Sequence, residues 1–203
     1  MENAVITIGR QYGSGGREIG EKLAGKLGYA YYDTLLLEKS AKESGLSQHI
    51  VERYDECLAD KWLNISLAGG VKDVSHLPLP LRAVLSQFEA IEQIGKKGSA
   101  VIVGRCADYV LQNKENVFSV FIHSEMSRRI ARVAQRNQIS EKEAGKRIRN
   151  TDKQRASYYN YYTDKEWGAS ESYNICVDSG KFGIDGAVDL LQACVQKLSG
   201  ESE

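Results

Sequence analysis

The sequence is poor in the residues from which metal centres and disulfide frameworks are built. Its 203 residues include four cysteines and three histidines, and no two cysteines form a C-x-x-C pair. Zinc sites and disulfide-rich scaffolds are recognised by close, regular spacing of such residues. This spacing gives no support for a zinc site, and reduced thiols are the expected state of the cysteines.

The sequence also has no net charge and no long apolar run. Its 27 Lys and Arg residues balance 27 Asp and Glu residues, so charge gives no general argument for a nucleic-acid or membrane partner. No stretch approaches 18 apolar residues, and the start, Met1-Glu2-Asn3, lacks the basic and apolar regions of a secretion signal. We therefore expect a cytoplasmic protein with small-molecule partners; the sequence leaves its oligomeric state open.

Glycine, by contrast, is concentrated after the first apolar run. Residues 4–8 (AVITI) are followed by the glycine-dense segment 9–18 (GRQYGSGGRE) and by an amphipathic stretch from Ile19 to Leu27. This order predicts a buried strand, a phosphate-binding loop and a helix. We expect the glycines at 13, 15 and 16 to adopt backbone angles closed to other residues, so that successive amides face one anion at the helix N-terminus. A glycine-rich turn without a ligand is the alternative.

The loop departs from the common pattern G-x-x-x-x-G-K-[ST]. With Gly13 aligned to the middle of that pattern, Gly16 stands in place of the lysine and Arg17 offers a replacement cation. Glu18 falls near the hydroxyl that usually helps to hold Mg²⁺, and Ser14 is the other nearby candidate, although neither is the usual ligand. The predicted ATP-binding residues are Gly9, Tyr12, Gly13, Ser14, Gly15, Gly16, Arg17 and Glu18.

Polar residues also follow two further predicted strands. The run Tyr29–Tyr32 ends in Asp33 and Thr34, and Ser99–Val103 is closely followed by Arg105. Open parallel sheets bind ligands at the carboxyl ends of their strands, so these three side chains are candidate ligand contacts. Capping of the next helix is a competing explanation for Asp33 and Thr34, and a surface or ion-pair role for Arg105.

Arginine is concentrated between residues 124 and 160. The predicted helix at 124–138 carries Arg129, Arg132 and Arg136 on one face, with Arg128 beside them. Ser140 and the residues up to Glu143 form a capping box that opens a second basic helix. Two such helices joined by a short turn predict a lid over a polyphosphate; a charged hairpin without that function is the alternative.

The remaining patterns predict one α/β domain over residues 1–203. Strands at 117–122 and 173–179 and a helix at 184–198 extend the predicted parallel sheet and its flanking helices into a three-layer P-loop fold. Residues 35–98 form a helical excursion from that sheet, with an amphipathic helix over 81–94. The aromatic residues at 158, 159, 161, 162 and 167 either stack a base or, more ordinarily, pack the base of the lid against the core.

Three segments, 9–18, 101–108 and 158–168, together resemble the bacterial cytidylate kinase-like family, a divergent branch of the nucleoside monophosphate kinases. The resemblance implies ATP and Mg²⁺ as cofactors and phosphoryl transfer to a small phosphorylated acceptor, with CMP or dCMP as first choice. A kinase of another small metabolite and a noncatalytic nucleotide-binding regulatory protein are the alternatives.

The resemblance also implies roles for individual residues. The segment 35–98 becomes an acceptor-binding subdomain and 124–160 an arginine-rich lid. The catalytic cations are Arg17, Arg128, Arg129 and Arg132, and the acceptor-binding residues are Asp33, Thr34, Lys39, Arg105, Asp152 and Arg155. Lys39 stands where the family has an arginine, Cys106 replaces an aspartate, and Ile148 falls at the place of a lid arginine.

Overall fold

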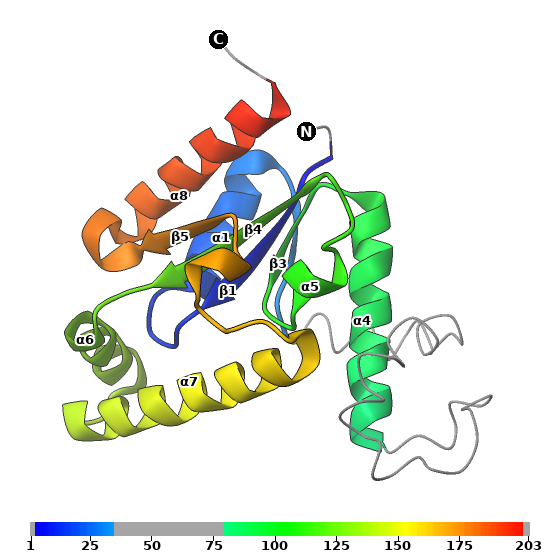
Figure 1. Ribbon diagram of the computed structural model, residues 1–203. Helices are drawn as coiled ribbons and strands as arrows, with labels where there is room; N and C mark the ends of the chain where they lie inside the picture. The colour runs from blue at the N-terminus through cyan, green and yellow to red at the C-terminus, as the bar shows by residue number, and fades with distance from the viewer. Residues whose placement is uncertain (1–2, 35–78, 201–203) are drawn as a thin grey trace.

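The computed structural model describes residues 3–34 and 79–200 (Figure 1). Lys39 and most of the predicted acceptor-binding subdomain lie outside these ranges. Along the chain, the described elements are β1 (Val5–Arg10), α1 (Gly16–Leu27), β2 (Ala30–Tyr32), α4 (Leu79–Lys97), β3 (Ala100–Val103), α5 (Ala107–Val110), β4 (Val117–His123), α6 (Met126–Asn137), α7 (Glu141–Thr163), the 3₁₀ turn η2 (Ser170–Ser172), β5 (Ile175–Asp178) and α8 (Ser179–Ser199).

The five described strands form one parallel sheet in the order β2-β3-β1-β4-β5. The central strand β1 pairs on one side with β3, where Val5 faces Ala100, and on the other with β4, where Val5 faces Val117. Because all the strands run the same way, their carboxyl ends meet at one edge, where such sheets place ligands. The predicted parallel sheet is confirmed.

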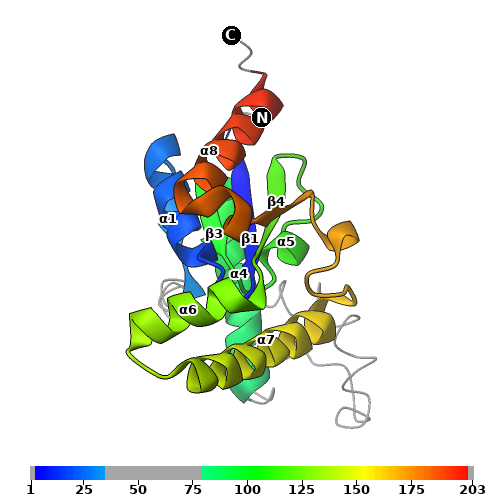
Figure 2. The same ribbon diagram turned by 90° about the vertical axis from the view of Figure 1, so that its left-hand side faces the viewer.

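Helices cover both faces of the sheet, as the two views in Figures 1 and 2 show. Ile19 and Leu23 of α1 and Leu191 of α8 are fully buried against one face, beside Ile6 and Ile8 of β1. The opposite face is covered by α4 and α5, whose buried residues include Leu85, Phe88 and Val110. Burial on both faces explains why the strands read as continuous β-branched runs rather than alternating patterns.

The two arginine-rich helices form a hairpin beyond the carboxyl ends of the strands, across the lower part of Figure 2. They pack together through Val133, Ala144 and Ile148, which form a small separate core. The Ser140 side chain accepts a hydrogen bond from the Glu143 amide, as the capping box predicts. At its far end α7 joins the main core, where Tyr159 is buried.

One boundary differs from the sequence prediction in a way that matters for the site. Strand β1 does not end at Ile8, because Gly9 and Arg10 continue the ladder opposite Phe121 and Ile122 of β4. The loop therefore begins at Gln11. A Cβ on Gly9 would lie 2.9 Å from the Phe121 ring, so the glycine at this position gives room for the core.

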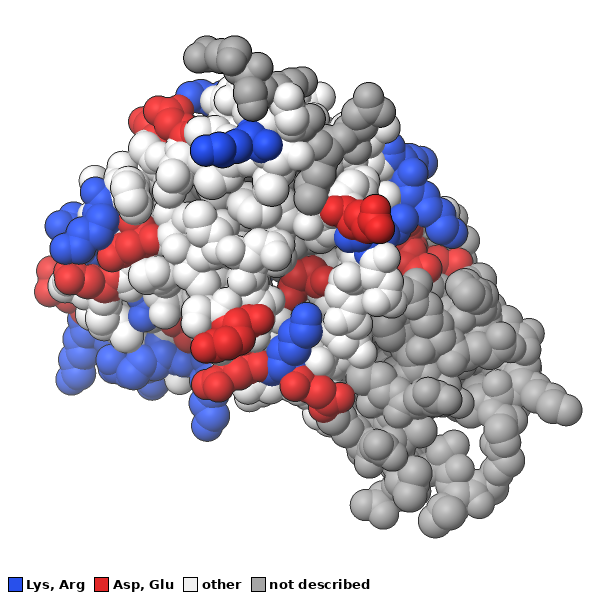
Figure 3. All heavy atoms as spheres, turned by 45° about the horizontal axis from the view of Figure 1, so that its top comes forward, with Lys and Arg blue, Asp and Glu red and all other residues white. Residues whose placement is uncertain are grey.

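Acidic and basic side chains are interspersed on the described part of the face shown in Figure 3, in keeping with the balanced composition. None of the described helices is both long and apolar enough to cross a membrane.

Candidate active site

The loop after β1 presents unpaired amides at the start of α1. Gly13 and Gly15 both have φ of 83°, which only glycine adopts without strain, and Gly15 is the N-cap of α1. Within residues 3–34 and 79–200, the amides of Gly13, Gly15 and Gly16 have no hydrogen-bond partner. A positive helix terminus with several unpaired N–H groups favours an anion.

Helices α6 and α7 clasp this loop through one buried ion pair. Arg129 of α6 and Asp152 of α7 lie 2.5 Å apart, with side chains 6% and 16% exposed. Asp152 also accepts a hydrogen bond of 2.7 Å from the Tyr12 amide, and Arg129 donates one of 3.3 Å to the Tyr12 carbonyl. The pair therefore fixes the backbone of the loop.

Two further arginines lie close to the Tyr12 ring. The guanidinium carbons of Arg136 and Arg155 are 5.4 Å and 5.6 Å from the ring centroid, and Arg136 donates to the Tyr12 hydroxyl at 3.1 Å. Arg155 also donates to the Arg10 carbonyl at 2.9 Å. Cation–π contacts of this kind hold both guanidiniums at the mouth of the loop.

A cavity of about 910 Å³ opens over the loop. Arg132 lines it and donates a hydrogen bond of 3.0 Å to the Gly13 carbonyl. Across the cavity, Arg17 forms an ion pair of 2.6 Å with Asp33 at the end of β2, although the Arg17 side chain is 65% exposed. The cavity thus combines amides and cations with acidic groups at its rim.

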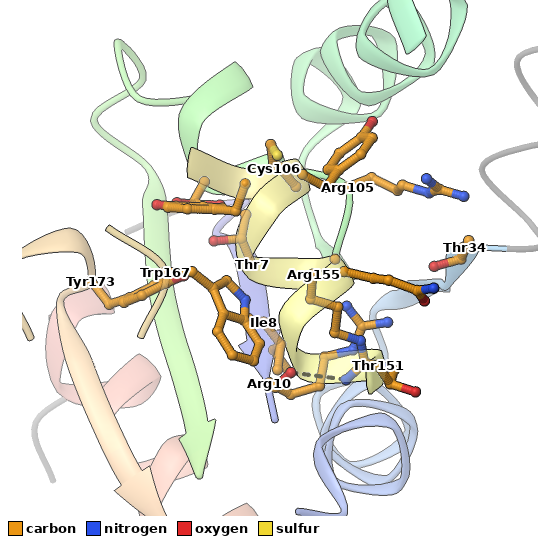
Figure 4. Close-up of a pocket in the computed structure, with 17 residues that line it drawn as sticks. Thr7, Ile8, Arg10, Thr34, Arg105, Cys106, Thr151, Arg155, Trp167 and Tyr173 are labelled. Carbon is orange, nitrogen blue, oxygen red and sulfur yellow. Dashed lines mark hydrogen bonds between the residues drawn. The ribbon is translucent and has the colours of Figure 1, made fainter. Parts of the chain in front are cut away.

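A second cavity of about 370 Å³ lies beside the first, and Figure 4 shows its lining. Trp167 and Tyr173 lie on one side and Arg10 and Arg155 lie close together on another, joined by the dashed hydrogen bond. Arg105 lies 5.5 Å from the centroid of the Tyr158 ring in the same lining. Aromatic walls with a few cations suit a flat, anionic ligand.

A half-buried carboxylate and a buried hydroxyl add polar groups to this second cavity. The Tyr159 hydroxyl donates to Asp108 at 2.6 Å. Burial raises the pKa of the Asp108 carboxyl above its ordinary value, and the hydrogen bond from Tyr159 opposes that shift. The Thr7 hydroxyl is buried with no hydrogen-bond partner among the described residues, so a ligand or water in the cavity would satisfy it.

The two cavities share Arg10, Thr34 and Arg155. The loop that ends β1 and the polar residues that end β2 and β3 therefore converge on one place, as expected for the carboxyl edge of a parallel sheet. Groups bound in the two cavities would meet at these three side chains.

The structure divides the predicted ATP-binding residues into three groups. The loop cavity is lined by Tyr12, Gly13, Gly15, Gly16, Arg17 and Glu18. Gly9 lines the second cavity instead. Ser14 lines neither, because its buried hydroxyl donates to the Gln11 carbonyl at 2.8 Å. The prediction that Gly16 adopts backbone angles closed to other residues was wrong, because this residue is the first of α1 and has no positive φ.

The other predicted residues are divided in the same way. Arg105 and Arg155 line the second cavity together with Thr34, whereas Asp33 lines only the loop cavity and Asp152 lines neither. Of the catalytic candidates, Arg17 and Arg132 line the loop cavity. Arg129 forms the buried ion pair with Asp152 and lines neither cavity. Arg128 also lines neither cavity; its side chain is 59% exposed and lies 3.9 Å from the Glu125 carboxylate.

Sequence reasoning missed two features of the site. Arg10 was read as part of the loop, yet it ends β1 and lines both cavities. An arginine separated by one glycine from a buried apolar run was the available signal, and the same pattern singled out Arg105. The pairing of Asp108 with Tyr159 had no signal, because the two residues are 51 positions apart.

Donors for a metal ion are limited in this site. Glu18, Glu21 and Asp33 line the loop cavity, but no three acidic, histidine or cysteine residues within 3–34 and 79–200 form a cluster that could hold a metal alone. Mg²⁺ in nucleotide sites is commonly held by one or two carboxylates together with phosphates and water. Glu18 and Asp33 fit that arrangement; the buried Ser14 hydroxyl does not.

Comparison with known proteins gives a consistent picture. The model of the cytidylate kinase-like family matches residues 5–181. A cytidylate kinase of Pyrococcus horikoshii is 25% identical over 97% of this chain and 91% of its own length, and one of Thermococcus kodakarensis is 27% identical over 96% and 89%. An uncharacterized protein from Eubacterium ventriosum superposes with a TM-score of 0.73 at 29% identity, covering 95% of this chain and 98% of that one. A shikimate kinase from Bacteroides thetaiotaomicron, at 15% identity, a TM-score of 0.51 and coverage of 95% and 98%, shares the fold.

Proposed function

The chain belongs to the cytidylate kinase-like family, and we propose that it transfers the γ-phosphoryl group of ATP to a nucleoside monophosphate, with CMP or dCMP as the first candidates. The observation that carries this proposal is the meeting of the two cavities at Arg10, Thr34 and Arg155. Phosphoryl transfer requires donor and acceptor to be held in line with cations around the moving group. Two adjoining cavities with shared arginines suit that requirement.

The loop cavity is the proposed donor site. Amides of Gly13, Gly15 and Gly16 would hold the phosphates of ATP, with Arg132 above them on α6. Because these donors are already fixed by the fold, they can stabilise developing charge without reorganising. Arg17 would join them by exchanging its carboxylate partner Asp33 for a phosphate.

The second cavity is the proposed acceptor site. Arg105 and Arg155 would bind the acceptor phosphate, and Trp167 and Tyr173 would contact the base through their ring faces and edges. The Asp108 carboxyl, whose pKa is raised by burial, and the Thr7 hydroxyl would offer hydrogen bonds to polar edges of the base. These groups come from β1, α5, α7 and the segments that precede α5 and follow α7, so the acceptor site depends on several parts of the fold.

Mg²⁺ is expected as the metal, held by Glu18 and Asp33 together with phosphate oxygens. The metal would neutralise charge on the transferring phosphoryl group when bound. Helices α6 and α7 are the proposed lid, and the clasp described above corresponds to its closed position.

An ADP-release assay with ATP, Mg²⁺ and a panel of nucleoside monophosphates tests the proposal. We expect turnover with CMP or dCMP, and an Arg105→Ala variant should raise the KM for the acceptor more than it lowers kcat, since Arg105 lines only the acceptor cavity. Turnover with an acceptor outside the panel would make the protein a kinase of another metabolite.

A noncatalytic nucleotide-binding role is the second candidate, because Gly16 stands where a P-loop lysine is usual and Arg17 is paired with Asp33. Tight ATP binding without turnover on any acceptor would favour this role over catalysis.

A further inference from the structure

The first residue of α1 is glycine at the position where P-loops carry lysine. Gly16 follows the N-cap residue Gly15, and in the pattern G-x-x-x-x-G-K-[ST] the residue at this place extends a cation to the β- and γ-phosphates. The helical backbone of Gly16 has no positive φ, so its conformation does not require glycine. Another constraint must explain the absence of a side chain.

Arg10 supplies that constraint. A Cβ built on Gly16 would lie 2.6 Å from the Cβ of Arg10 and 3.1 Å from its Cγ. Contacts this short between carbon atoms near the backbone cannot be relieved by rotating a side chain. The Arg10 side chain therefore begins in the space from which a lysine at position 16 would extend.

The Arg10 guanidinium then lies over Gly104, where an added Cβ would overlap its Nη1 atom. The side chain lines both the loop cavity and the adjoining acceptor cavity. No carboxylate in residues 3–34 and 79–200 makes an ion pair with it. Gly16 and Gly104 thus leave the space that the Arg10 side chain occupies, and its cation lies at the junction of the two cavities.

The electrostatics of this position favour an incoming anion. Burial, together with the nearby Arg155 and Arg105, lowers the pKa of Arg10 to about 9, and Tyr31 and Asp33 offset only part of this shift. A guanidinium destabilised in this way is stabilised when phosphate oxygens replace the lost water. Its planar fork can bind two oxygens at once.

We propose that Arg10 has taken over the role of the P-loop lysine: the cation is carried at the end of β1 rather than at the start of α1, and Gly16 is the space that this exchange requires. The proposal rests on the loop being the ATP site. It does not depend on which acceptor is used, so it can be tested by ATP binding alone.

The first test measures binding of ATP and, separately, of CMP by calorimetry. Arg10→Met, which keeps an unbranched apolar stem and removes the guanidinium and its charge, should weaken ATP binding about tenfold to a hundredfold, as expected for losing charge-assisted hydrogen bonds. Arg10→Lys should retain most of the affinity. Arg147→Ala is the control, because Arg147 is exposed, pairs with Glu143 and lines neither cavity.

Two results would overturn the proposal. ATP affinity unchanged in Arg10→Met shows that the guanidinium does not bind the donor phosphates. Loss of CMP binding with ATP binding intact assigns Arg10 to the acceptor. Absence of turnover with every acceptor, by contrast, would count against the proposed reaction and leave this result standing.

The second test exchanges the two residues. Gly16→Lys alone should lower both the melting temperature and ATP affinity, because its Cβ meets that of Arg10. Replacing Arg10 by glycine removes the Cβ that a lysine at position 16 would meet. The double variant R10G/G16K can then place its lysine in the usual position, and it should bind ATP at least about tenfold more tightly than Arg10→Gly. A folded double variant no better than Arg10→Gly would refute the exchange; if it does not fold, the comparison of Arg10→Met with Arg10→Lys decides.

Discussion

The clasp formed by Arg129 and Asp152 gives the sharpest prediction about the lid. Both side chains are largely buried, and removing one partner of a buried ion pair leaves a charge without compensation, which typically costs about 3–5 kcal/mol. Asp152→Ala should therefore lower the free energy of unfolding by about that amount. In a domain of this size, each kcal/mol corresponds to roughly 2–4 °C in melting temperature.

The same variant separates two roles for Asp152. The carboxylate accepts the Tyr12 amide and lines neither cavity, so its loss should weaken ATP binding and leave acceptor binding nearly unchanged. Urea unfolding and calorimetry measure both effects. The control is Asp189→Ala, which removes an exposed pair with Lys26 and should cost less than about 1 kcal/mol.

A double-mutant cycle completes the test. Arg129→Met and Asp152→Ala together should destabilise the protein by less than the sum of the single changes, because the double variant no longer buries an uncompensated charge. If Asp152→Ala melts with the wild type and raises only the KM for the acceptor, the clasp has been misread, and Asp152 binds the acceptor as the family resemblance implied.

Two further predictions concern the acceptor cavity and the seat of Arg10. Burial raises the pKa of Asp108, so the wild type has its full stability below the unfolded pKa of this carboxyl and loses part of it as pH rises through the folded pKa. The melting temperature of Asp108→Asn relative to wild type should therefore increase as pH rises above about 4, the ordinary pKa of a carboxyl group. A pH-independent difference would refute this. Gly104→Ala places a side chain at φ of 89° and against Arg10, so it should cost about 1 kcal/mol or more and weaken ATP binding, whereas Gly186→Ala, inside α8 with only ordinary contact to Phe182, should do neither.

The fold was predictable because its signals are local. Buried β-branched runs, amphipathic spacing and the capping box at Ser140 each depend on neighbours in sequence, and the structure confirms them. The spacing of Arg129, Arg132 and Arg136 also predicted one shared face. That face meets the loop, where the three side chains contact Tyr12 and Gly13.

The partners of those arginines were not predictable from spacing. Whether an arginine serves a ligand or the fold depends on which carboxylate lies across from it, and Asp152 reaches Arg129 only because α7 folds back along α6. The same limit applies to Gly16. A motif shows that the lysine is missing, but only the three-dimensional contact with Arg10 shows what fills its place.

These contacts also bear on how the lid would move. If α6 and α7 swing open together about the end of α7 that is fixed in the main core, the pair of Arg129 with Asp152 stays intact within the hairpin. The hydrogen bonds broken are then those to the Tyr12 amide, carbonyl and hydroxyl, the Gly13 carbonyl and the Arg10 carbonyl. Each involves a charged group and is worth about 1.5–3 kcal/mol when buried and less when exposed. Opening should therefore cost several kcal/mol without a ligand to offset it. For the proposed reaction, we expect the hairpin to rest closed and product release, rather than chemistry, to limit turnover.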